Sequence, residues 1–289
     1  MKTIKSLNSV RINGELPDTH LKTLDLEAGT VRVPLIFLID ISGSMDAALP
    51  IINETLTKLM GDIYSAQGPD RFMVDFAIIT FGGSNSKGET IQVARDFDLL
   101  HPGEKFQISK CEGLTPLSAA MLYAYWYGAA RKQQYKDTEV SYNQPTVVVI
   151  SDFFENGSGP VVVDGSTYSG DQLYDEVAEL YSTAFHTSYK QYTYVITPPG
   201  QSVNHAKIKK LNVDVVEDEH LDIARVLAQV LAEYKASVAM AAMEDEESNA
   251  AIAAGDIMDN HLGDWLHRMK QVEPFLPDDP AEDLKIVEC

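Results

Sequence analysis

The sequence predicts an α/β fold: a doubly wound, mostly parallel central sheet with one antiparallel edge strand and helices on both faces. From residue 31 onward, short apolar runs alternate with longer segments of helical period, the pattern of parallel strands joined by crossover helices. The runs VPLIFLI (33–39) and TVVVI (146–150) lack polar alternation, which predicts central strands covered on both faces. A Gly- and Ser-rich stretch (82–89) joins apolar residues 72–81 to 90–97, which predicts an antiparallel pair at the edge.

Apolar residues spaced three or four apart predict the helices that cover this sheet. The first begins at Pro50, because proline is favoured in the first helical turn, and its apolar positions run to Ile63. The remaining expected elements are helices over 117–134, 173–185 and 222–243, and strands over 192–197 and 213–217.

The chain divides by composition into three parts. We expect an N-terminal extension (1–30), one α/β domain (31–243) and an acidic, partly helical C-terminal extension (244–289). The last part has 13 acidic and 3 basic residues, so it carries half of the formal charge of −20. Two readings stay open: this segment keeps the chain in solution, or it docks on a partner or on the domain, where one of its acids would cap the site described below and inhibit it.

Composition limits the function. The chain has 289 residues, of which 45% are hydrophobic and 23% charged, values typical of a folded soluble protein. Its pI near 4.6 argues against binding to nucleic acid or to an anionic membrane, since both need clustered Lys and Arg. Two cysteines, Cys111 and Cys289, cannot form a disulfide framework, and no leader peptide or apolar span of about 18 residues is visible. We expect a cytoplasmic protein whose partners are proteins or cations.

Side chains with oxygen atoms gather where the central strands end. Asp40 and Asp152 end two neighbouring strands, and ligands collect outside the carboxyl ends of such strands. Ser42 and Ser44 follow Asp40 at intervals of two, and Thr115 precedes a helix that it could also begin. Five oxygen donors without Cys or His favour a hard cation such as Mg²⁺ over zinc.

Three segments carry a resemblance to a known family. DISGSM (40–45), GLTPL (113–117) and ISDFFENG (150–157) together resemble the von Willebrand factor A domain over residues 31–240, with its metal-ion-dependent adhesion site. The resemblance implies a Rossmann-like fold and a site for Mg²⁺, with Mn²⁺ or Ca²⁺ as alternatives. In that site the hydroxyls would bind directly and the acids partly through water, leaving one coordination position for the Asp or Glu of a protein partner. The implied ligands are Asp40, Ser42, Ser44, Thr115 and Asp152.

Two stretches, SGSM (42–45) and GLTPLSAAM (113–121), are similar to a bacterial intracellular group that includes tellurium-resistance-associated and stress or conflict proteins. Proteins of that group typically occur beside kinases, phosphatases or ATPases. The resemblance therefore implies a non-enzymatic adaptor that has no catalytic residues. Two other functions stay open: a structural subunit of an assembly, and a metal-dependent phosphoryl-transfer or hydrolytic enzyme, although the sequence ties no catalytic base to the site.

The same residues also have purely structural interpretations, and some could suggest other enzyme classes. Asp, Ser and Thr at strand ends often serve only as turn and helix-cap residues. A serine hydrolase is disfavoured because Met45 follows Ser44 and the G-x-S-x-G motif is absent, and a phosphoaspartate enzyme because Ser42 occupies the place of a second aspartate. Phe153 and Phe154 follow Asp152 directly; either both rings flank a partner, or one turns inward.

Overall fold

A computed structural model describes the greater part of the chain before residue 217. The described residues are 4, 10–12, 21, 31–66, 72–83, 90–138, 142, 145–183, 191–198, 202–211 and 214–216. The expected helix over 222–243 and the acidic extension over 244–289 lie outside them, and these two expectations stay untested.

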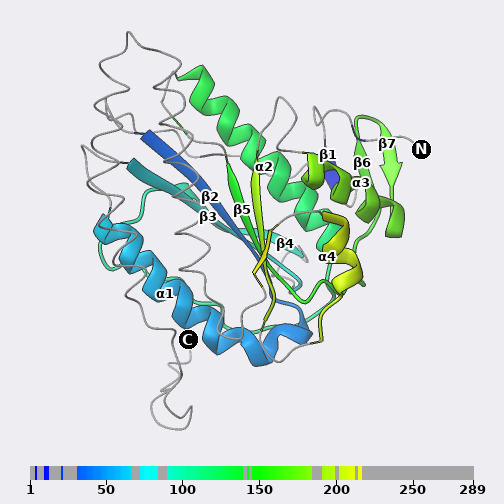
Figure 1. Cartoon of the computed structure of the whole chain (residues 1–289), viewed down its shortest axis with the longest axis horizontal. Coiled ribbons are helices and arrows are strands. Elements are labelled where there is room, and N and C mark those ends of the chain that lie inside the picture. Colours follow the sequence, from blue (N-terminus) through cyan, green and yellow to red (C-terminus); the bar gives the residue numbers. More distant parts are fainter. Residues whose placement is uncertain are drawn as a thin grey trace.

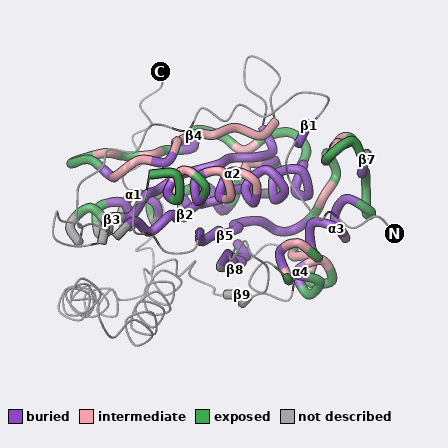
Figure 2. The backbone as a smooth tube through the Cα atoms, turned by 90° about the horizontal axis from the view of Figure 1, so that it is seen from above, coloured by how far each residue is buried: buried purple, intermediate pink, exposed green. Residues whose placement is uncertain are grey.

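A six-stranded sheet forms the centre of the molecule (Figure 1), and it confirms the predicted fold class. Its spatial order is β4-β3-β2-β5-β8-β9, with every neighbouring pair parallel except the edge pair β3 and β4. The strands are β2 (Val31–Asp40), β3 (Phe72–Phe81), β4 (Ile91–Asp98), β5 (Thr146–Ile150), β8 (Tyr192–Ile196) and β9 (Asp214–Val216). Figure 2 shows β5 buried along its length and β4 partly exposed, as a central and an edge strand should be.

Helices cover both faces of this sheet, as Figure 1 shows. One face packs its apolar residues against α1 (Leu49–Ala66), which follows the short 3₁₀ helix η1 (Gly43–Ala48). The other face packs against α2 (Leu117–Asp137) and α3 (Gly170–Thr183), and α4 (His205–Leu211) lies against α3. Among the helices in the described ranges, none has the length and apolar character needed to cross a lipid bilayer.

A second, three-stranded sheet was not expected from the sequence. Strand β1 (Val10–Ile12) pairs antiparallel with β6 (Val161–Val163), which forms a hairpin with β7 (Ser166–Tyr168). The hairpin turns through Asp164 and Gly165, both with positive φ, at 46° and 78°. An Asp-Gly pair between two short strands is a hairpin signal, so the β6–β7 hairpin could have been predicted from the sequence.

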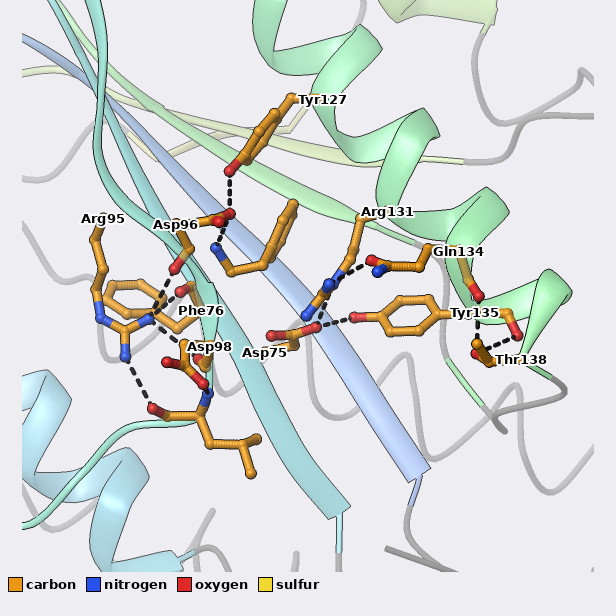
Figure 3. Close-up of polar contacts among 12 residues, drawn as sticks. Asp75, Phe76, Arg95, Asp96, Asp98, Tyr127, Arg131, Gln134, Tyr135 and Thr138 are labelled. Atoms are coloured by element: carbon orange, nitrogen blue, oxygen red, sulfur yellow. Dashed lines mark hydrogen bonds and ion pairs between the residues drawn. The ribbon is translucent and has the colours of Figure 1, made fainter. Parts of the chain in front are cut away.

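A buried polar cluster lies between β3 and the last turns of α2 (Figure 3). The Asp75 Oδ2 atom accepts hydrogen bonds from Arg131 Nε, at 2.7 Å, and from the Tyr135 hydroxyl, while its Oδ1 atom has no partner among the described residues. Asp75 pairs with Pro34, six residues before the Asp40–Phe81 pair at the other end of these strands, roughly 20 Å away. The cluster is therefore distant from the strand ends where the metal site is predicted.

Candidate metal site

The two predicted acidic ligands leave neighbouring parallel strands at the same edge of the sheet. Asp40 is the last residue of β2, and Asp152 follows β5 by two residues. Both side chains are buried. The hydroxyl of Ser151, also buried, donates a hydrogen bond of 2.7 Å to Asp40 Oδ2, so the two strand ends are joined directly.

The loop after β2 folds back on Asp40. The backbone N–H of Ser42 donates to Asp40 Oδ1 at 2.8 Å, and the Ser42 and Ser44 hydroxyl oxygens are 3.2 Å apart. Ser42 is buried, whereas Ser44 is exposed at the start of η1. The alternating spacing therefore brings both hydroxyls to one place with a route to solvent.

Two glycines let three backbone segments approach one another around this loop. A Cβ on Gly82, whose φ is 125°, would lie 2.4 Å from the Ser42 nitrogen. One on Gly113, whose φ is 81°, would lie 2.7 Å from the Gly82 carbonyl oxygen. Since a side chain fits at neither position, glycine is needed at both. The chain leading to Thr115 consequently runs beside the serine loop, where the Glu112 N–H donates to the Ile41 carbonyl at 2.8 Å.

Thr115 is buried and is held by the segment that follows Asp152. The Asn156 side chain accepts a 2.7 Å hydrogen bond from the Thr115 N–H, and the Asn156 N–H donates to the Thr115 carbonyl at 3.2 Å. This reciprocal pair fixes one predicted ligand relative to the segment that carries another.

The start of α2 corrects one expectation. Thr115 does not begin the helix: the N-cap is Pro116, which makes no side-chain cap hydrogen bond. Instead, Glu155 accepts hydrogen bonds from the N–H and the hydroxyl of Ser118, and Ser158 Oγ accepts one from the Ala119 N–H at 3.3 Å. Two orphan N–H groups of the first turn, those of Ser118 and Ala119, are thus satisfied by residues 37 and 39 positions away, which local capping patterns do not reveal.

Burial of two acids side by side makes the site electrostatically demanding. The pKa of the Asp40 carboxyl is raised to about 6: burial is the main cause, hydrogen bonds from Ser42 and Ser151 oppose the rise, and the negative charge of Asp152 adds to it. In the described part of the chain, no ion pair involves Asp40 or Asp152. The donor set therefore fits a divalent cation, which would compensate both charges.

The site differs from metal centres built on charged or imidazole ligands. Within the described ranges, no three His, Cys, Asp or Glu side chains are grouped so that they could hold a metal ion. The predicted set has two carboxylates and three hydroxyls, so it falls outside this type of cluster.

One of the two phenylalanines after Asp152 turns inward. Phe153 is fully buried and has a φ of 61°, a left-handed conformation that is uncommon for a bulky residue. Phe154 points out, and its N–H donates to Asp152 Oδ1 at 3.0 Å. Of the two interpretations offered by the sequence, the second describes the structure.

Sequence reasoning missed the residues that hold the ligands. Ser151, Glu155 and Asn156 each bond across to another segment, and no local pattern marks such contacts. The signal available was only their place beside Asp152 in the polar stretch ISDFFENG.

The fold and this edge together define a doubly wound α/β domain with an oxygen-lined site at the ends of its central strands. No family model and no curated protein sequence matches the chain. Among solved structures, it is similar to the pilus adhesin SpaC of Lactobacillus rhamnosus GG, with 10% identity and a TM-score of 0.45 over 86% of this chain and 31% of SpaC.

Two further solved structures are similar over a smaller share of the chain. The mussel byssus proximal thread matrix protein 1 has 17% identity and a TM-score of 0.37, over 68% of this chain and 42% of that protein. The manganese-loaded TRAP protein of Plasmodium vivax has 17% identity and a TM-score of 0.35, over 64% of this chain and 61% of that protein. The chain thus spans about a third of SpaC.

Proposed function

We propose that the chain is a von Willebrand factor A domain protein that binds Mg²⁺, or alternatively Mn²⁺ or Ca²⁺, at the ends of β2 and β5. The observation that carries the proposal is the pair of buried acids, Asp40 and Asp152, joined through Ser151 and without an ion-pair partner in the described part of the chain. Asp40, Ser42, Ser44, Thr115 and Asp152 would hold the ion. A bound divalent ion supplies positive charge and a coordination position open to an outside ligand.

We infer an adaptor role for this site. The two carboxylates just balance a divalent ion, so the loaded site is neutral and accepts a further carboxylate from a protein partner. Ser44 is exposed, which leaves the site accessible to such a residue. The chain would act inside a bacterial cell as a non-enzymatic component of a stress or conflict system such as tellurium resistance, beside a kinase, phosphatase or ATPase.

Direct measurement of metal binding tests the site. Isothermal titration of the purified chain with MgCl₂ should show one site, and Asp40→Asn should abolish it because the central carboxylate is lost. Asp46→Asn is the matched control: Asp46 is an exposed carboxylate in η1, outside the proposed ligands, and its loss should leave the affinity within about twofold.

The adaptor role needs a second experiment. Partner proteins recovered from the native cell with Mg²⁺ should be lost with EDTA and with Asp40→Asn, but retained with Asp46→Asn. Identical recovery under all four conditions would refute metal-bridged recognition, even if the chain binds the ion.

A further inference from the structure

Two large apolar side chains are exposed beside the predicted ligands. Leu114, at 59% exposure, directly precedes Thr115, and Phe154, at 43%, follows Asp152 by two residues. The described residues contain one other exposed large hydrophobic side chain, Tyr64 at 40%, fifteen residues into α1. Exposed apolar side chains therefore concentrate at the site rather than over the described surface.

The backbone holds these two side chains in place. Leu114 and Phe154 lie on segments joined by the reciprocal hydrogen bonds of Asn156 with Thr115. A Cβ on Gly157 would lie 2.8 Å from the Leu114 Cβ atom, so the two segments are in close contact. Phe153 anchors its neighbour Phe154 in the core. A surface fixed in this way loses little conformational entropy when a partner covers it.

Two exposed acids lie on the segments around the serine loop. Asp46 is in η1, and Glu112, whose N–H bonds to the Ile41 carbonyl, pairs with Lys110 at 2.8 Å. With a net charge of −20, the chain repels an acidic partner at long range. Attraction across the contact must therefore come from coordination at short range and from apolar burial at Leu114 and Phe154.

Resting on the proposed function, we propose that the partner's metal-binding Asp or Glu stands next to a large aliphatic or aromatic residue, which packs against Leu114 and Phe154. The site then recognises two features together: a carboxylate that completes the coordination of the ion, and an apolar neighbour that packs on Leu114 and Phe154. We call these two side chains the rim. An acidic residue flanked only by polar or charged residues would lack the second contact.

An array of nonapeptides tests this specificity. Each peptide has a central Asp, and each flanking position is varied through the twenty amino acids; the labelled full-length chain is applied with Mg²⁺ or with EDTA. Peptides with Leu, Ile, Phe or Met beside the Asp should bind at least about fivefold more tightly than those with Ser or Gly there, in Mg²⁺ only. Raising NaCl should leave this binding unchanged or strengthen it, because like charges are screened.

Variants test whether Leu114 and Phe154 cause the preference for an apolar residue beside the Asp. Leu114→Ser and Phe154→Ser should each remove most of the preference for an apolar flank while leaving Mg²⁺ affinity unchanged by titration. Tyr64→Ser, which removes an equally exposed ring outside the rim, should keep the preference. Mg²⁺-dependent binding without any flanking preference, or a preference that survives in both rim variants, would overturn this inference alone. Failure of every Asp peptide to bind in Mg²⁺ would overturn the proposed carboxylate recognition, and this inference with it.

Discussion

Asp40 is held in the folded chain in a state that favours its protonated form. Burial raises the pKa of this carboxyl to about 6, above the ordinary value of 3.8. Because the folded-state pKa is the higher one, the contribution of Asp40 to the stability of the metal-free protein is full below pH 3.8. That contribution is lost as the pH rises through 6. A metal ion needs the carboxylate, so metal and proton compete for the same oxygens.

This competition predicts pH-dependent metal binding. Mg²⁺ affinity should be about tenfold weaker at pH 5 than at pH 7.5, since a group with a pKa of about 6 is roughly nine-tenths protonated at pH 5. Titration calorimetry in buffers of different ionisation enthalpy, at pH 6, should also report proton release on binding. The exposed Asp46→Asn variant should show the same profile, and equal affinity at both pH values would contradict the role of Asp40.

The Asp75 cluster makes a separate prediction at the opposite end of the strands. Asp75→Asn should lower the free energy of unfolding by about 3–5 kcal/mol, because it leaves the buried Arg131 guanidinium without its carboxylate. Tyr135→Phe, which removes one hydrogen bond, should cost only about 1 kcal/mol. Urea unfolding measures both changes.

Its control removes both charges together. The double variant Asp75→Leu with Arg131→Met should recover part of the loss, since apolar residues of similar size replace a buried ion pair at little cost. Mg²⁺ affinity should not change in any folded variant, given the distance of roughly 20 Å along β3. A double variant less stable than Asp75→Asn would contradict this account of the cluster.

At the scale of elements, α2 and the loop over 155–158 depend on each other. Asn156→Leu should leave the buried Thr115 N–H without an acceptor and lower the free energy of unfolding by about 1–3 kcal/mol. It should also weaken Mg²⁺ binding, because Thr115 is a proposed ligand. Asn156→Asp keeps an acceptor oxygen and should restore both quantities. If Asn156→Leu were destabilised but bound Mg²⁺ as tightly as the unaltered chain, Asn156 would be structural only.

The same elements show which structural features could be predicted from the sequence and which could not. The apolar runs of β2 and β5 predicted central strands, and the Gly- and Ser-rich loop after Phe81 predicted the antiparallel edge, because burial on two faces and turn chemistry both leave local patterns. The cap of α2 left no local pattern, since Glu155 and Ser158 accept hydrogen bonds from helix N–H groups that are distant in sequence. The residues predicted as ligands were named by type and spacing, whereas those that hold them in position required the three-dimensional contacts.

At the scale of the whole molecule, the negative charge should weaken the folded state at low salt. With a net charge of −20, self-repulsion opposes compaction. Raising NaCl from about 50 mM to 0.5 M should therefore increase the free energy of unfolding, on the order of 1 kcal/mol, because screening shortens the range of repulsion between exposed charges. Urea titrations at the two salt concentrations measure this change, and a loss of stability at high salt would contradict it.

The side chains that cap α2 come from the loop after β5, and this has a consequence for local opening. The first turn of α2 cannot fray while the loop over 155–158 stays closed, nor can that loop open without exposing the helix start. Amides of Thr115, Ser118 and Asn156 should consequently exchange with deuterated solvent through one common opening, with equal protection factors after division by their intrinsic rates. The segments that carry Thr115 and Asp152 would then be either both closed or both open when an ion arrives, so metal binding would be all-or-none.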